Sequence, residues 1–205
     1  MWYHHPVPPT IPTLDIVREK LKNWDGCPLR KTCTQAVLGE GNAKAEVMFI
    51  GEAPGEQEDK QGRPFVGPAG KFLDELLGTI GFERKDVYIS NVVKYRPPNN
   101  RDPTPEEKAQ CLPWLMMEIA LIKPKVLVPL GRHALTSFFS KLNITAAHGK
   151  PQSVRMGEGA AMTVFPIYHP AAALHNPGLR DALYSDFRAL GEFLKKSDSL
   201  VVNGA

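Results

Sequence analysis

Three segments rich in glycine, proline or polar residues each follow directly after an apolar run of this sequence. They are Gly51-Glu52-Ala53-Pro54-Gly55, the residues from Asn91 onward, and His169-Pro170. A histidine after a strand can hydrogen-bond a developing oxyanion. An asparagine amide offers a donor and an acceptor to the edge of an imide-like base. Because ligands bind beyond the carboxyl ends of parallel strands, the three segments together predict an active site.

Each of these features has a second interpretation when taken alone. Phe65, within Gly62-Arg63-Pro64-Phe65-Val66-Gly67, could stack on a flat heterocycle or could pack in the core. The carboxylates between residues 52 and 59 could serve a ligand or could form a solvated acidic loop. Asn91 could form a strand-end turn, and a lone histidine is more often structural. The functional prediction therefore depends on the convergence of the segments.

The motifs of several enzyme classes are absent from the sequence. No Gly-Lys-Ser/Thr follows the first segment, which disfavours a nucleoside triphosphatase, and no Gly-x-Ser-x-Gly is present, which disfavours a serine hydrolase. The sequence has an odd number of cysteines, and none of them are in C-x-x-C spacing: Cys27, Cys33 and Cys111. They predict neither a disulfide framework nor a zinc site, and they agree with a reducing compartment.

Strands and helices are predicted to alternate along the chain. Apolar and β-branched runs predict strands at 45–50, 87–93, 126–130 and 164–168. Helical spacing and capping residues predict helices at 14–22, 71–81, 105–122, 131–139 and 180–196. This alternation predicts an α/β fold with a mostly parallel sheet covered on both faces. We expect a flexible N-terminal arm over 1–12, a single domain over 13–196 and a flexible tail over 197–205.

Charge and hydropathy limit where the protein acts. Its 205 residues include 25 Lys+Arg and 22 Asp+Glu, a formal net charge of +3, which permits nucleic-acid binding without requiring it. No apolar run approaches the roughly 18 to 20 residues of a membrane-spanning helix. The N-terminal residues lack the pattern of a secretory signal. We therefore predict an intracellular protein without a membrane partner.

Taken together, the motifs resemble those of the family 4 uracil-DNA glycosylases. The resemblance extends from about residue 26 to residue 193, and its motifs are Gly51–Gly55 with Glu58-Asp59, Gly62–Gly70, Asn91–Lys94, Arg96–Arg101 and His169-Pro170. It implies a three-layer α/β/α sandwich around a four-stranded, mainly parallel sheet. The implied activity is hydrolysis of the bond between uracil and deoxyribose in DNA, the first step of base excision repair. An abasic site remains.

The resemblance also implies roles for the candidate residues. Phe65 would stack on the flipped uracil, Asn91 would recognise its N3–H and O4, and His169 would hydrogen-bond O2 and stabilise the departing anion. Glu52 would position water or stabilise the positive sugar. Glu58 would lie near C5 and exclude the methyl group of thymine. The uracil-binding set is completed by Gly51 and Ala53.

The implied partner is uracil-containing DNA, single- or double-stranded. Lys94, Arg96, Arg101 and Lys150 are candidate phosphate contacts, although each could be an ordinary solvated charge. The loop of Pro170, Ala171 and Leu174 would enter the groove beside the lesion and fill the vacated space. We expect a monomer that acts in the cytoplasm, associated with the nucleoid.

The sequence departs from the resembled family at its cofactor. Family 4 enzymes typically hold a [4Fe-4S] cluster through four cysteines, and the matching positions here are Trp24, Cys27, Tyr95 and Cys111. Tryptophan and tyrosine are not usual cluster ligands, and a cubane cluster normally needs four thiolates. We therefore predict no cofactor and no metal, with Trp24 and Tyr95 filling the volume around the two cysteines. Cys33 is the one spare thiol.

Other functions stay open at this point. A glycosylase of the same superfamily could act on another deaminated base, such as hypoxanthine or xanthine. The chain could instead be a catalytically weak module that binds damaged DNA, although the presence of Glu52, Phe65, Asn91 and His169 argues against this. An unrelated nucleotide-binding α/β protein is disfavoured by the absent phosphate loop.

Overall fold

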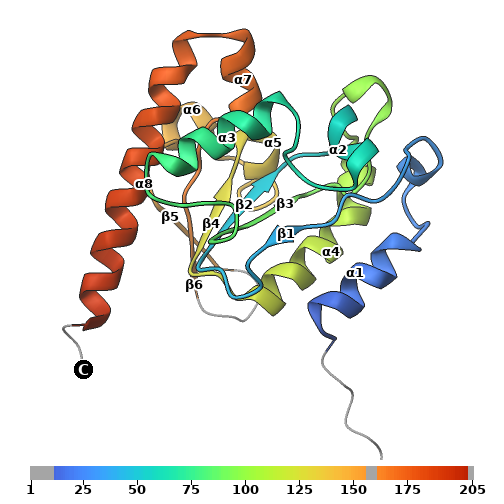
Figure 1. Cartoon of the computed structure of the whole chain (residues 1–205), viewed down its shortest axis with the longest axis horizontal. Coiled ribbons are helices and arrows are strands. Elements are labelled where there is room, and N and C mark those ends of the chain that lie inside the picture. Colours follow the sequence, from blue (N-terminus) through green and yellow to red (C-terminus); the bar gives the residue numbers. More distant parts are fainter. Residues whose placement is uncertain (1–11, 156–160, 203–205) are drawn as a thin grey trace, which may run out of the picture.

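The computed structural model describes residues 12–155 and 161–202 of the chain (Figure 1). The flexible arm predicted over 1–12 falls outside the described residues except for Pro12. Residues 203–205 of the predicted tail also fall outside them. The last helix, α8, continues to Val202. It therefore overlaps the first part of the tail that we expected to be flexible.

One sheet of six strands forms the centre of the described part of the chain. The strands are β1 (Glu40–Gly41), β2 (Val47–Gly51), β3 (Tyr88–Asn91), β4 (Val126–Pro129), β5 (Gln152–Arg155) and β6 (Ala161–Val164). Their order is β1-β3-β2-β4-β6-β5. The inner four strands are parallel, and β1 and β5 add antiparallel edges.

The predicted four-stranded parallel sheet is therefore the inner part of a larger one. The prediction missed β1, which is only two residues long, and β5, whose alternating exposed polar residues lack an apolar run. The prediction of a strand over 164–168 was also misplaced, because β6 ends at Val164. Pro166 has no N–H to donate to a ladder, so pairing beyond it is reduced to one bridge between Ile167 and Leu130.

Eight α-helices occur in the described residues. They are α1 (Leu14–Lys22), α2 (Glu56–Gln61), α3 (Pro68–Gly78), α4 (Pro105–Ile122), α5 (Gly131–Leu135), α6 (Ile144–Ala147), α7 (Pro170–His175) and α8 (Gly178–Val202). Short 3₁₀ turns lie at Pro28–Lys31 and Pro98–Asn100. The predicted helices at 14–22 and 105–122 have these bounds. The short helices α2, α6 and α7 were not predicted, because four to six residues carry little apolar periodicity.

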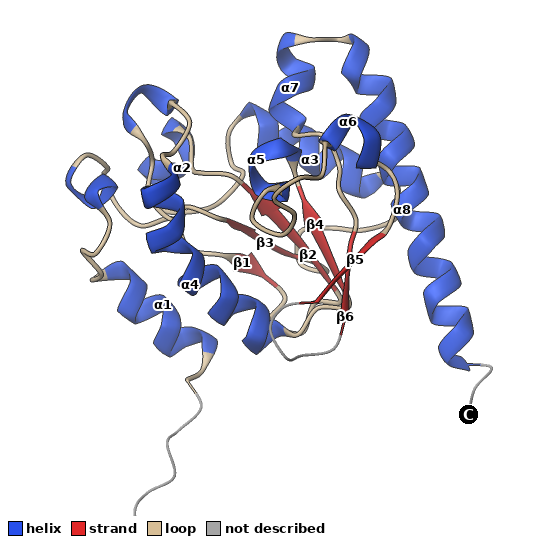
Figure 2. Cartoon of the chain, turned by 180° about the vertical axis from the view of Figure 1, so that it is seen from behind, coloured by secondary structure: helices blue, strands red, loops and turns tan. Residues whose placement is uncertain are grey.

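Helices cover both faces of the sheet, as the α/β/α prediction requires. Alternate residues of β2 point to opposite faces. Met48 and Ile50 pack in a core with residues of α1 and α4, whereas Val47 and Phe49 pack in a second core with residues of α3 and α8. Figures 1 and 2 show α1 and α4 on one side of the sheet and α3 and α8 on the other. The three-layer α/β/α fold is confirmed.

The carboxyl ends of the parallel strands meet at one edge. The Cα partner of Gly51 is Asn91, that of Ile50 is Pro129, and Leu130 bridges to Ile167. The segments that follow these strands therefore start side by side.

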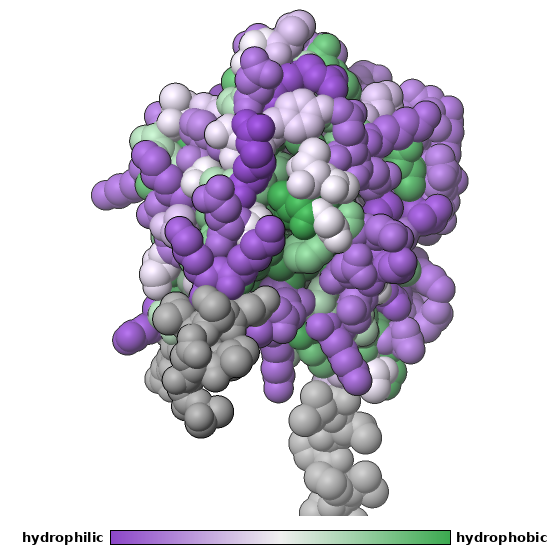
Figure 3. Space-filling view, turned by 60° about the vertical axis from the view of Figure 1, so that its left-hand side comes forward, coloured by the Kyte–Doolittle hydropathy of each residue, from purple (hydrophilic) through white to green (hydrophobic). Residues whose placement is uncertain are grey.

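The surface is mainly hydrophilic on the face shown in Figure 3, where charged and polar side chains surround a small apolar area. In residues 12–155 and 161–202, no helix combines the length and apolar character needed to cross a membrane.

Candidate active site

A cavity of about 380 Å³ opens at the carboxyl edge of the sheet. It is lined by Ala53, Gly55, Glu58, Phe65, Ala69, Asn91, Asn100, His169, Ala171 and His175. The three segments that the sequence singled out thus surround one space. Ala53, Glu58, Phe65, Asn91 and His169, all predicted site residues, lie in its wall.

Gly51 lies directly against both the Asn91 amide and the Phe65 ring. A Cβ at position 51 would stand 2.3 Å from Oδ1 of Asn91 and 2.7 Å from the Phe65 ring. Both distances are far below van der Waals contact. The last residue of β2 must therefore be glycine if the amide and the ring are to border the same cavity.

Phe65 has a backbone conformation that non-glycine residues rarely adopt, with φ of +53°. Such strain costs free energy and persists only where the surroundings enforce it. The ring is buried and stacks on the imidazole of His169, with centroids 5.6 Å apart and planes inclined by 27°. The two rings therefore form one wall of the cavity, against which a planar ligand can lie.

Arg84 holds the backbone around Phe65 in place. Its Nη1 donates to the Phe65 carbonyl at 2.8 Å, and its Nη2 donates to the Pro64 carbonyl at 2.6 Å. Asp74 pairs with the same guanidinium at 3.0 Å. The sequence analysis missed Arg84, because its position in the loop before β3 carries no motif.

Glu58 lines the cavity, but its carboxylate is occupied by backbone amides. Oε1 accepts from the N–H groups of Val66 and Gly67 at 2.9 and 2.8 Å, and Oε2 accepts from that of Gly55 at 3.2 Å. These bonds connect the first turn of α2 to the loop that follows Phe65. In this structure Glu58 therefore positions backbone that borders the cavity.

His169 precedes α7, and its ring has a defined hydrogen-bonding state. Nδ1 accepts from the backbone N–H of Ala171 at 3.1 Å, so the proton of the neutral ring is on Nε2. Burial lowers the pKa of His169 to about 4, with Glu58 acting against this shift and His133 adding to it. At neutral pH His169 is therefore uncharged, with an N–H available to donate.

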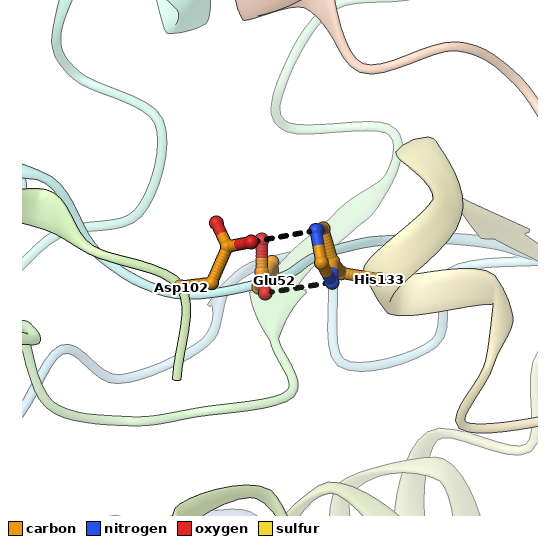
Figure 4. A group of neighbouring side chains, drawn as sticks. All are labelled: Glu52, Asp102 and His133. Carbon is orange, nitrogen blue, oxygen red and sulfur yellow. Dashed lines mark ion pairs between the residues drawn. The ribbon is translucent and has the colours of Figure 1, made fainter. Parts of the chain in front are cut away.

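Glu52 lies beside this cavity among residues from two other elements. Its Oε1 is 3.2 Å from Nζ of Lys108 on α4 and 3.3 Å from Nδ1 of His133 on α5. Asp102 contacts the other ring nitrogen of His133 at 3.1 Å, as Figure 4 shows. The sequence analysis missed Lys108 and His133. His133 could have been found, because it lies shortly after the predicted strand at 126–130, as Glu52 lies shortly after the first predicted strand.

The predicted phosphate contacts do not all lie on the surface. Lys94 is fully buried and forms an ion pair with Glu118 at 2.6 Å and a hydrogen bond with Ser90 at 2.7 Å. A buried and paired ammonium cannot contact DNA, so the prediction for Lys94 was wrong. The residue faces the α4 layer, where Glu118 neutralises it.

The other candidate DNA contacts remain near the site or exposed. Arg101 pairs through both terminal nitrogens with Glu107, and Arg96 donates to Asn100 at 2.8 Å. Lys150 is exposed.

The residues that follow His169 differ in their exposure to solvent. Pro170 is buried, Ala171 lines the cavity, and Leu174 on α7 is 42% exposed. Leu174 is one of two large apolar side chains that stand out from the described surface.

The four positions that match cluster ligands lie together on the α1 and α4 side of the sheet. Cys27 and Cys111 are buried, and burial raises the pKa of the Cys111 thiol to about 12. Trp24 stacks on Tyr95 with ring centroids 5.9 Å apart, and the Tyr95 hydroxyl donates to the carbonyls of Leu21 and Trp24. The predicted aromatic packing is confirmed. The ligand positions thus offer only the thiols of Cys27 and Cys111, and the Tyr95 hydroxyl already donates to backbone carbonyls. This set does not fit a four-iron cluster, which normally needs four thiolates.

The strand-end cavity of this α/β/α sandwich combines an aromatic ring, an amide and a neutral histidine, groups whose chemistry suits a planar polar ring. Residues 38–190 match the sequence model of a protein family that is described as "Uracil DNA glycosylase superfamily".

Individual relatives agree with this match. The chain is 49% identical to a type-4 uracil-DNA glycosylase of Sulfurisphaera tokodaii, over 88% of this chain and 84% of the relative. It is 49% identical to that of Archaeoglobus fulgidus (89% and 93% covered) and 46% identical to that of Thermotoga maritima (89% and 95% covered). The chain therefore belongs to the type-4 branch of the uracil-DNA glycosylase superfamily.

Proposed function

We propose that this protein is a uracil-DNA glycosylase that hydrolyses the N-glycosidic bond of deoxyuridine in DNA and leaves an abasic site for base excision repair. One observation carries the proposal. Phe65, Asn91 and His169 come from three distant segments and border one cavity that is kept open by Gly51.

Recognition begins when the target nucleotide leaves the base stack, since a base inside a duplex cannot reach a buried pocket. The ring of Phe65 supplies the stacking surface that replaces its neighbours in the DNA. The Asn91 amide accepts from N3–H of uracil and donates to O4. Cytosine presents an acceptor and a donor at these two positions, so it leaves the amide unmatched.

Bond cleavage leaves negative charge on the departing uracil. The Nε2–H of neutral His169 donates to O2, where part of that charge develops. The low pKa of this histidine keeps the ring uncharged at neutral pH, and the hydrogen bond from the Ala171 N–H to Nδ1 keeps its proton on Nε2. The bond between N1 and C1′ breaks with both electrons on uracil. The oxygen of a water bonds to C1′, and the proton of that water passes to the carboxylate of Glu52.

Discrimination against thymine follows from the shape of the cavity. Glu58 holds the backbone amides of Val66 and Gly67, and it thereby fixes the wall that a 5-methyl group would meet. Steric exclusion of this kind needs a wall that does not yield. The three hydrogen bonds to the Glu58 carboxylate provide that rigidity.

Contacts with the DNA backbone are assigned to Arg96, Arg101 and Lys150. Lys94 is not assigned such a contact, because it is buried. Leu174 on α7 enters the space that the flipped nucleotide leaves. The protein acts as a monomer on single- or double-stranded DNA in the cytoplasm, where its substrate lies.

The protein acts without an iron-sulfur cluster, because Trp24 and Tyr95 occupy two of the four ligand positions. The anaerobically purified protein is expected to be colourless and free of iron. An absorption band at about 400 nm with about four irons per chain would contradict this.

The test of the proposed function is cleavage of labelled oligonucleotides that carry one uracil, hypoxanthine, xanthine or thymine. Uracil should be excised and thymine left intact. His169→Ala should lower the single-turnover rate by about 10²- to 10³-fold, the usual effect of removing one donor to a developing anion. Excision of hypoxanthine or xanthine in preference to uracil would change the assigned base. Binding of uracil-containing DNA without excision would show that the protein is a DNA-binding module and not an enzyme.

A further inference from the structure

The carboxylate of Glu52 lies against basic side chains from two helices that are distant in the sequence. Nζ of Lys108 lies 3.2 Å from Oε1 of Glu52 and also 3.2 Å from Nδ1 of His133. Nδ1 of His133 lies 3.3 Å from the same oxygen. Three side chains, from the turn after β2, from α4 and from α5, thus meet at one carboxylate oxygen.

The ring of His133 is itself fixed from its other side. Its Nε2 lies 3.1 Å from Oδ2 of Asp102 and 2.9 Å from Nε of Arg132. Figure 4 shows the imidazole between the two carboxylates, with one ion pair to each. The His133 ring therefore cannot turn without giving up contacts on both sides.

These contacts occur where water has little access. Oε1 of Glu52 is buried and makes no hydrogen bond of good geometry, and the whole side chain is 19% exposed. A buried carboxylate oxygen is costly unless charge compensates it. The Lys108 ammonium provides that compensation. The ammonium and the Arg132 guanidinium also make a metal ion unsuitable at this cluster, because they would repel it.

Glu52 borders two further cavities. It lines one of about 220 Å³ together with Ala53 and Asn100, and one of about 600 Å³ together with His133 and Tyr168. His169 lines both. The carboxylate therefore stands beside the space in which water would approach the sugar.

We propose that Lys108 and His133 are positioning residues for the Glu52 carboxylate. This rests on the proposed function, in which Glu52 accepts the proton of the attacking water. Lys108 and His133 fix Oε1 from two directions, and this places the carboxylate for that proton. Neither residue lines the cavity that Phe65, Asn91 and His169 border.

A double-mutant cycle tests the proposal, because it measures whether two residues act through each other. Lys108→Met and His133→Leu are each compared with the parent, and both are repeated in the Glu52→Gln background. The readouts are the single-turnover rate at saturating enzyme and the enzyme concentration for half the maximal rate. Lys141→Met is the matched control, because Lys141 is an exposed lysine outside the site.

Each substitution should lower the saturating rate by about tenfold and leave the half-saturating concentration within about twofold. In the Glu52→Gln background the same substitutions should change the rate by less than about twofold. His133→Gln should recover part of the rate that His133→Leu loses, because its amide restores a polar group beside Glu52. Lys141→Met should behave as the parent does.

Equal losses in both backgrounds would overturn the proposal, as would a change confined to the half-saturating concentration, which indicates a DNA contact. If the proposed function itself is wrong, the parent protein will leave uracil intact, and this distinguishes that outcome from a failure of the positioning proposal alone. In that case the same cycle is measured through urea-unfolding midpoints. Additive shifts there would overturn the contact between Glu52 and the two residues.

Discussion

Two regions of this molecule are built from residues that the sequence singled out, yet they use their polar groups in opposite ways. Around the cavity, the Asn91 amide and the Nε2–H of His169 border open space. On the α1 and α4 side, the hydroxyl of Tyr95 and the ammonium of Lys94 are committed to internal partners.

This difference separates groups that can do chemistry from groups that stabilise the fold. Changes in the cavity should alter the rate of uracil excision with little effect on stability. Changes on the α1 and α4 side should alter stability with little effect on the rate.

The largest expected effect concerns Lys94. In Lys94→Met the free energy of unfolding should fall by about 3–5 kcal/mol, because Glu118 is left buried without its partner. Urea unfolding of the two proteins measures the loss. The half-saturating DNA concentration of the folded variant should equal that of the parent. A weakened DNA affinity at unchanged stability would restore Lys94 as a phosphate contact.

The next effect concerns the floor of the cavity. Gly51→Ala should lower the single-turnover rate by more than about 100-fold, because the new Cβ must displace the Asn91 amide or the Phe65 ring by about an ångström. Gly78→Ala is the matched control, because no atom lies within 4 Å of a Cβ there, and its rate should be unchanged. Near-parental activity of Gly51→Ala would show that the cavity adapts.

A smaller effect is expected at the position that replaces a cluster ligand. Tyr95→Phe should lower the free energy of unfolding by about 1–2 kcal/mol, since the carbonyls of Leu21 and Trp24 lose a buried donor. The rate of uracil excision should stay within about twofold. A tenfold loss of the excision rate would show that the α1 and α4 side influences the cavity, and it would contradict the division of roles between the two regions.

The last expected effect is a dependence of stability on pH. His169 has a folded pKa of about 4, below the 6.5 of the unfolded chain, so the unfolded state binds more protons in that window and stability falls as pH decreases from 6.5 to 4. Burial raises the pKa of Asp186, which acts in the opposite direction and reduces the net slope.

Denaturant unfolding at pH 7, 5.5 and 4.5 measures this slope, and His169→Asn, which cannot titrate, should have a flatter profile. Identical slopes in the two proteins would contradict the assigned protonation state of His169.

Much of the architecture followed from local patterns. Apolar runs closed by glycine or polar residues predicted three of the four inner strands, β2, β3 and β4, and Thr104-Pro105 with Glu107 predicted the start of α4 where its capping box lies. The rule that ligands bind at strand ends placed Asn91 and His169 together. These predictions succeeded because strand alternation, helix capping and strand-end geometry each depend on neighbours within a few residues.

The tertiary structure alone decided how the charged residues are used. Lys94 and Arg96 are two residues apart and both look like phosphate contacts, but one is paired in the core and the other borders the surface. Glu58 reaches amides beyond Phe65, and Glu52 meets Lys108 and His133 across intervals that no local pattern spans. The fate of a charge depends on which distant group the fold brings within about 3 Å of it and on how much water remains there.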